Sequence, residues 1–163
     1  MKTICRIILI VFFSMFSFGL FANELSVLFV HNSVHNTGDG INVAYDFDSV
    51  GVSAGIGYDV NHIWDVTMGI KYAFKYIYPF VNYSIYYTKY GKGSYELHSL
   101  IAGVGSKANI DDDVYIFIEA GAMKNIYHEF KLGGYSFNET FPKQTPALNL
   151  VFGFGFGYVI NWM

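Results

Sequence analysis

Cysteine, proline and charged residues are scarce in this chain of 163 residues. The single cysteine, Cys5, excludes a disulfide framework and any metal site built from several cysteines. Charged residues amount to 14% and the formal net charge is −3, so we expect no basic surface for binding nucleic acid. Hydrophobic residues reach 53% and aromatic residues 20%, which excludes a disordered chain. The length suits one folded domain.

The N-terminus has the pattern of a secretory signal peptide. Lys2 and Arg6 precede an apolar run at 7–18, and polar chain begins at Asn23. This run is shorter than the ~20 residues that a membrane-spanning helix needs. We therefore expect Sec-type export with removal of residues 1–22, which leaves residues 23–163 as the mature domain.

The mature chain alternates with a period of two, which is the period of a β-strand. In the segment 148–162 the even positions carry large apolar side chains, and the odd positions carry glycine, asparagine or valine. The even positions are Leu148, Leu150, Phe152, Phe154, Phe156, Tyr158, Ile160 and Trp162. A soluble sandwich would place polar side chains on its second face. Here glycine dominates that face instead.

Such alternation is typical of a transmembrane barrel, in which large apolar side chains face lipid and small ones face a narrow interior. The aromatic excess fits girdles at the two membrane interfaces, and the sheet must close because lipid cannot satisfy unpaired backbone groups. We expect an all-β, antiparallel up-and-down transmembrane barrel with loops at 34–40, 89–94 and 127–145. The eight expected strands are 24–33, 41–47, 50–60, 64–74, 76–88, 95–108, 113–126 and 146–162. The stretch 41–60 could also be one long bent strand.

Two segments resemble small outer-membrane barrels of the OmpA/opacity type, namely 57–66 (GYDVNHIWDV) and 97–105 (LHSLIAGVG). The resemblance implies an eight-stranded barrel in the bacterial outer membrane, inserted by the outer-membrane assembly machinery. It also implies functions such as adhesion, carried by extracellular loops that contact a host or surface ligand. Tyr158, Ile160 and Trp162 resemble the aromatic C-terminal assembly signal of this family, although the chain ends in Met163 where the family has phenylalanine.

Two other segments resemble the lipid A deacylases, another barrel family. They are 117–121 (FIEAG) and Leu148-Asn149 followed by Gly153-x-Gly155. That family hydrolyses its substrate with a His-x-Ser pair and an acid, which lie further along the chain than these segments. The present sequence has no counterpart of that pair there, which leaves open a shortened barrel without a final hairpin.

One His-x-Ser pair does occur, at His31 and Ser33. Spacing of two residues on a strand places both side chains on one face, as a nucleophile and its general base require. Asp39, Asp46 or Glu119 could supply the acid that orients the imidazole. The alternative is an ordinary polar strand end that runs into a loop.

Four charged residues, Asp59, Asp65, Lys71 and Glu119, fall on the expected inner face. Charges in lipid are costly, so we expect these four to face the lumen and to pair with one another. A structural ion-pair network that fills the interior is one interpretation, and a proton or ion path is the other. An eight-stranded barrel is just wide enough for side chains to fill, which disfavours a large pore.

The segment 127–145 is expected to be the longest extracellular loop. Its candidate contact residues are Tyr127, His128, Phe130, Tyr135, Phe137 and Phe141, which could equally form the upper aromatic girdle. The five histidines are scattered, so we expect no metal site and no cofactor. The expected partners are outer-membrane lipid and lipopolysaccharide. We expect a structural or surface-interaction role, with a lipid-modifying hydrolase as the first alternative and a narrow channel as the second.

Overall fold

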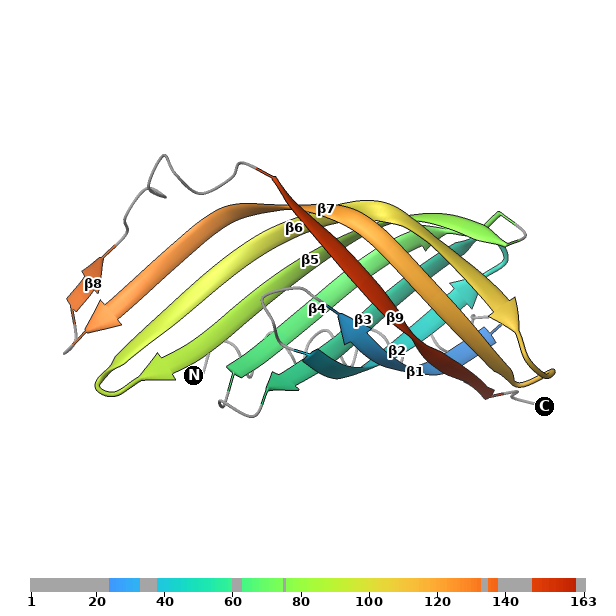
Figure 1. Ribbon diagram of the computed structural model, residues 1–163, viewed down its shortest axis with the longest axis horizontal. Helices are drawn as coiled ribbons and strands as arrows, with labels where there is room; N and C mark the ends of the chain where they lie inside the picture. The colour runs from blue at the N-terminus through green and yellow to red at the C-terminus, as the bar shows by residue number, and fades with distance from the viewer. Residues whose placement is uncertain are drawn as a thin grey trace.

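The computed structural model describes residues 24–32, 38–59, 63–74, 76–132, 135–137 and 148–160. These residues form a nine-stranded antiparallel sheet (Figure 1). Its strands are β1 (Glu24–Asn32), β2 (Gly38–Phe47), β3 (Val50–Asp59), β4 (Ile63–Tyr72), β5 (Ile77–Tyr90), β6 (Gly93–Asn109), β7 (Val114–Leu132), β8 (Tyr135–Phe137) and β9 (Asn149–Ile160). The expected signal peptide at 1–22 lies outside the described residues and stays a prediction. No described helix is long and apolar enough to cross a membrane.

Eight of the strands close into a barrel, which confirms the expected all-β fold and strand number. β1 pairs with both β2 and β9, and β7 pairs with both β6 and β9. The three-residue β8 only extends the end of β7. Because β9 bonds to β1 along eight register pairs, closure needs no further hairpin.

Seven of the eight expected strands agree with the structure to within three residues at each end, and the expected loop at 34–40 loses residues 38–40 to β2. The stretch 41–60 is two strands that turn at Asp48, whose φ of 49° suits a tight connection. The expected loop at 89–94 is a tight hairpin in which Gly91 has a φ of 57°, a backbone conformation that glycine adopts without steric cost. The expected loop at 127–145 is wrong in its first part, because β7 continues as a strand to Leu132.

The register is staggered around the barrel. From Tyr115 on β7, successive register partners lead once around the sheet and return to β7 ten residues further along, at Asn125. The partners are Tyr115, Gly157, Leu28, Asn42, Gly55, Thr67, Ser84, Ser99 and Asn125. This stagger requires strands that are tilted against the barrel axis, by about 35–45° in known barrels.

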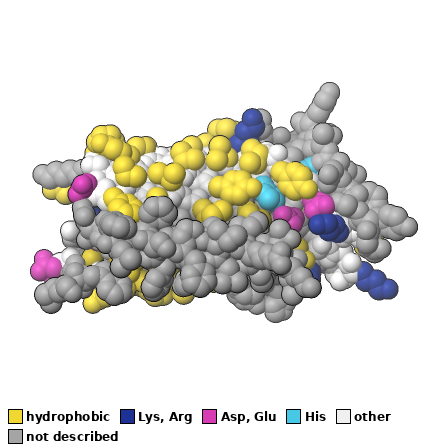
Figure 2. Space-filling model, turned by 180° about the vertical axis from the view of Figure 1, so that it is seen from behind, with side chains coloured by type: hydrophobic (Ala, Val, Ile, Leu, Met, Phe, Trp, Pro, Cys, Tyr) yellow, Lys and Arg dark blue, Asp and Glu magenta, His cyan; other side chains and the backbone are white. Residues whose placement is uncertain are grey.

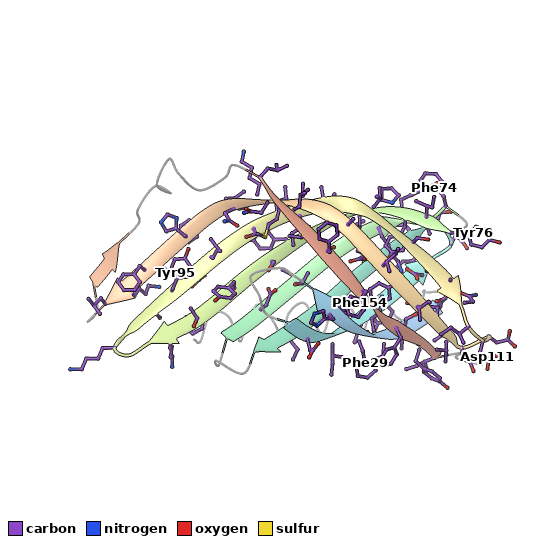
Figure 3. The ribbon with its side chains drawn as sticks, viewed as in Figure 1. Phe29, Phe74, Tyr76, Tyr95, Asp111 and Phe154 are labelled. Carbon is purple, nitrogen blue, oxygen red and sulfur yellow. The ribbon has the colours of Figure 1, made fainter. Side chains whose placement is uncertain are left out.

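The two ends of the barrel differ. The tight turns at 48–49, 73–76 and 110–113 lie at one end, together with Glu24 and Ile160; we call this the short-turn end. The opposite, loop end carries the connections β1–β2, β3–β4, β5–β6 and β7–β9. Figure 3 shows Phe74, Tyr76 and Asp111 at the short-turn end and Tyr95 toward the loop end. Strands β5, β6 and β7 have 14, 17 and 19 residues and extend past the other strands at the loop end (Figure 1).

Aromatic rings fill the inside because glycines stand opposite them on neighbouring strands. Tyr78 pairs with Gly105 and Tyr115 pairs with Gly157. A Cβ atom at either glycine would lie 2.3 Å from the Cζ atom of the opposite ring, so each ring occupies the space that a side chain would take. Phe80 and Phe117 also lie opposite glycines, Gly103 and Gly155, although there a backbone oxygen is nearer to the added Cβ atom than the ring is. The glycine-rich face of the sequence is therefore what lets a narrow barrel have a packed core.

Candidate functional site

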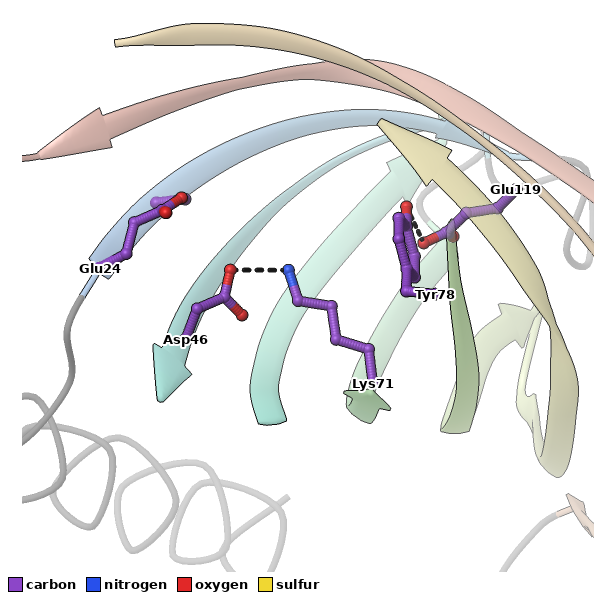
Figure 4. Close-up of polar contacts among 6 residues, drawn as sticks. Glu24, Asp46, Lys71, Tyr78 and Glu119 are labelled. Atoms are coloured by element: carbon purple, nitrogen blue, oxygen red, sulfur yellow. Dashed lines mark hydrogen bonds and ion pairs between the residues drawn. The ribbon is translucent and has the colours of Figure 1, made fainter. Parts of the chain in front are cut away.

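The lumen contains a group of polar side chains that we call the lumen network: Asp46, Lys71, Tyr78 and Glu119 (Figure 4). The Lys71 ammonium lies 2.9 Å from Asp46 Oδ2, and its Nζ atom is 5.6 Å from the centre of the Tyr78 ring. The Tyr78 hydroxyl donates a hydrogen bond of 3.0 Å to Glu119 Oε1. These residues come from four strands, so the register of the closed barrel is what brings them together.

Three of the four expected lumen charges do face the interior, but they do not pair with one another. Lys71 pairs with Asp46, Glu119 accepts from Tyr78, and Asp65 accepts a hydrogen bond of 2.5 Å from Ser84. No ion pair joins Asp65, Lys71 and Glu119 in the described structure, although the charge of Lys71 does act on Glu119. The side chain of Asp59 lies outside the described part. The physical reason is that hydroxyl groups satisfy both carboxylates: Ser84 donates to Asp65 from the neighbouring strand, and Tyr78 donates to Glu119 across β6.

The middle of the lumen is filled with large side chains. Tyr78, Phe80, Ile101, Met123 and Val151 form one buried cluster across the interior. Cavities of about 50 and 40 Å³ lie beside it, and Glu119 lines both. Spaces of this size hold one or a few water molecules. The described part of the lumen therefore does not favour a channel.

The predicted base His31 lies on the outer face of the barrel with a carboxylate beside it. His31 Nδ1 is 2.8 Å from Asp39 Oδ1, and the two side chains are 52% and 89% exposed. The Phe154 ring packs at 5.0 Å from the imidazole. Of the three acids considered, Asp39 is the partner of His31, whereas Asp46 and Glu119 face the lumen. Ser33 lies outside the described residues.

A second set of side chains on the outer face, near the loop end, combines a hydroxyl, an imidazole and a carboxylate. We call Tyr83, Glu96, His98 and Tyr127 the outer polar cluster. The Tyr83 hydroxyl hydrogen-bonds to His98 Nδ1, and His98 Nε2 lies 2.8 Å from Glu96 Oε1. The Tyr127 ring meets the imidazole edge-on, with ring centres 5.0 Å apart at 87°. Figure 2 shows histidine, acidic and lysine side chains close together toward this end, beside hydrophobic side chains of the described surface.

A β-bulge shapes this cluster. The register between β6 and β7 shifts at His98 and Ser99, so that Ile126 is an extra residue on β7. As a result Ile126 and Tyr127 are both exposed, at 52% and 41%, although they are consecutive. Bulges commonly re-aim a side chain in this way. Sequence reasoning missed the cluster, but His98 and Glu96 fall on the same alternating face as the apolar Leu100 and Val104, which was the available signal.

The expected contact residues of the 127–145 loop are mostly strand residues. Tyr127, His128 and Phe130 belong to β7, and Tyr135 and Phe137 form β8 on its edge. Phe141 and Trp162 lie outside the described part. Of the expected assembly signal, Tyr158 is exposed on the outer face at the short-turn end. The strand continues past residue 126 because the backbone from Tyr127 to Leu132 keeps its register with β6.

No protein-family model matches the chain, and no curated protein sequence matches it either. Within the described ranges no group of three or more histidine, cysteine, aspartate or glutamate side chains is placed to hold a metal ion.

Proposed function

We propose that the chain is a transmembrane barrel of the bacterial outer membrane that acts through its loop end. The observation that carries this proposal is the outer surface, where large apolar side chains are exposed on strands all around the barrel. Examples from different strands are Phe29, Ile41, Ile56, Ile70, Val81, Val104, Ile118 and Phe152, with exposures from 41% to 65%. A protein in water rarely exposes so large an apolar surface.

The ends of this surface also suit a membrane. Tyr72, Phe74, Tyr76 and Tyr158 are exposed near the short-turn end, where an interfacial aromatic girdle would lie. Strands of 9 to 12 residues, such as β1 to β4 and β9, have the length of about 9–11 residues that crosses a bilayer when tilted. Insertion by the outer-membrane assembly machinery belongs to the same proposal.

A surface role follows from the three long strands. The parts of β5, β6 and β7 near the loop end extend beyond the other strands and would stand outside the bilayer (Figure 1). Their inner side carries aromatic rings, with Tyr95 lying 6.5 Å from Tyr86 and 6.3 Å from His128 between ring centres. Such a platform offers rings and hydrogen-bonding groups to a surface ligand or to lipopolysaccharide, and requires no cofactor.

Arginine substitutions along β5 test the membrane proposal. Val81 and Ile77 share the outward face and are 49% and 57% exposed, but Ile77 is close to the short-turn end. In lipid vesicles Val81→Arg should lower the free energy of unfolding by more than Ile77→Arg, because the cost of a charge rises from about 0–1 kcal/mol near an interface toward the middle of the bilayer. Denaturant unfolding, with the unboiled and boiled forms compared on a gel, measures both. Equal small costs for the two variants would indicate that the outer face lies in water.

A lipid-modifying hydrolase is the second candidate, favoured by the contact between His31 and Asp39. Asp39 occupies Nδ1, so Nε2 of the imidazole is left to activate a hydroxyl or a water, as in a catalytic triad. Under this candidate His31→Ala should slow hydrolysis of a lipid ester by ~10²–10⁴-fold. Asp111→Ala, at an exposed position of the short-turn end, serves as the control. Equal rates for the two variants and the unmodified protein would exclude His31 as the base.

A further inference from the structure

We propose that Tyr83, His98 and Glu96 form a nucleophilic site on the outer face that cleaves acyl esters of membrane lipids. The proposal rests on the membrane placement argued above, but not on His31 or Asp39. It uses three groups that the register of β5 and β6 fixes: a hydroxyl, an imidazole and a carboxylate. A nucleophile bonded to a base that is oriented by a third group is the general arrangement of covalent catalysis.

The hydrogen bonds fix which atom of His98 carries the proton. Glu96 as a carboxylate can only accept, so Nε2 of His98 must be the donor to Oε1. In the neutral imidazole Nδ1 is then the unprotonated nitrogen and accepts the hydrogen bond from the Tyr83 hydroxyl. This tautomer can take a proton from Tyr83, and Glu96 is placed to stabilise the imidazolium that results. The edge-on Tyr127 ring holds the imidazole from the β7 side.

The surroundings of the cluster indicate the substrate class. On β6 the outward neighbours of His98 toward the short-turn end are apolar, with Leu100 42% and Val104 57% exposed. Toward the loop end the outer face turns polar, and Glu129 pairs with Lys131 at 2.7 Å. The cluster therefore lies where an apolar band meets a charged rim. In a bilayer that boundary is the depth at which ester groups join acyl chains to headgroups.

The reaction balances with water as the only co-reactant. Tyr83 Oη attacks the ester carbonyl carbon while its proton passes to His98 Nδ1. The bond between that carbon and the alcohol oxygen then breaks, and His98 returns the proton to the departing alcohol. Water next attacks the acyl-tyrosine and gives a proton to His98. The Tyr83 oxygen leaves and recovers that proton, which releases a carboxylic acid.

Ester hydrolysis by the full chain in detergent tests the proposal. The probes are 4-nitrophenyl butyrate, which needs no membrane, and phosphatidylglycerol vesicles. We expect Tyr83→Phe to remove activity to the background rate and His98→Gln to lower it by ~10²–10⁴-fold. The control Tyr158→Phe, exposed on the outer face at the short-turn end and far from the cluster, should keep full activity. Mass spectrometry after the butyrate ester should find the acyl group on Tyr83.

Each result then has one meaning. Three results would overturn the proposal. Tyr83→Phe could keep full activity, or activity could be lost only in His31→Ala. The third is that a chain that shows the compact unboiled band hydrolyses neither probe. Hydrolysis of the butyrate ester that depends on Tyr83, by a chain that does not fractionate with membranes, would sustain the chemistry and overturn the membrane placement. Tyr83→Phe removes only a hydroxyl group, so we expect this variant to stay folded. The compact unboiled band on the gel monitors its folding.

Discussion

Gly157→Val should keep the barrel from closing, and removing the Tyr115 ring in the same chain should restore closure. A Cβ atom at Gly157 would lie 2.3 Å from Tyr115 Cζ and 2.7 Å from its hydroxyl oxygen. All three of the nearest atoms belong to the Tyr115 side chain, so the steric conflict is with that ring and not with the backbone. We expect Gly157→Val to lose most of the compact unboiled form.

Tyr115→Ala alone should fold with a loss of about 3–5 kcal/mol, as for other large-to-small changes of a buried aromatic residue. The double variant should be more stable than Gly157→Val, since the valine then occupies part of the space left by the ring. This non-additive recovery, measured as a double-mutant cycle by denaturant unfolding, is the expected result. If the losses of stability in the two single variants simply added in the double variant, the Tyr115 ring would not be what blocks a side chain at Gly157.

Gly155 supplies the contrasting pair. A Cβ atom there would lie 2.0 Å from the backbone oxygen of Phe29 as well as 2.8 Å from Phe117 Cζ. Removing the Phe117 ring leaves the carbonyl of β1 in place, so Phe117→Ala should not rescue Gly155→Val. Because β1 and β9 form the closing seam, this position is expected to be the less tolerant of the two.

Alternation along the sequence was enough to predict the barrel but not all of its faces. In β9 every even position is large and apolar, so strand, phase and outward face could all be predicted from the sequence. In β7 the charged residues Glu129 and Lys131 resemble loop composition, although they alternate along a strand that has left the apolar band. Composition therefore indicates where the apolar band of the outer face ends, but it does not indicate where the backbone hydrogen bonds of the strand end.

The site residues illustrate a second limit. Lys71 and Asp46 meet across β3, where Gly51 between them leaves room for both side chains. That contact depends on the register of three strands, which single-strand periodicity does not provide. The outer polar cluster depends in addition on a bulge at Ile126, and a bulge shifts the phase of the alternation from which faces are predicted.

The ion pair of Lys71 and Asp46 leads to the second large effect, because the pair is held between strands inside the barrel. Asp46 Oδ1 is buried without a hydrogen-bond partner in the described structure, and Oδ2 contacts Lys71. Lys71→Met would remove that contact and leave an uncompensated carboxylate, with side-chain exposure of only 15%. Breaking a buried pair from one side costs about 3–5 kcal/mol. Denaturant unfolding in vesicles should therefore show a marked loss of stability.

Two variants show whether charge, and not side-chain volume, causes the loss. Asp46→Asn combined with Lys71→Met removes both charges and should recover most of the stability, since replacing a buried pair by neutral groups is often nearly neutral. Lys107→Met is the matched control, because the Lys107 ammonium lies 5.2 Å from the centre of the Tyr115 ring and such a contact contributes about 0.5–2 kcal/mol. Equal losses for Lys107→Met and Lys71→Met, without recovery in the double variant, would mean that the lysine stems stabilise the lumen by packing. The expected order of stability places the double variant and Lys107→Met well above Lys71→Met, because only Lys71→Met leaves a buried charge unpaired.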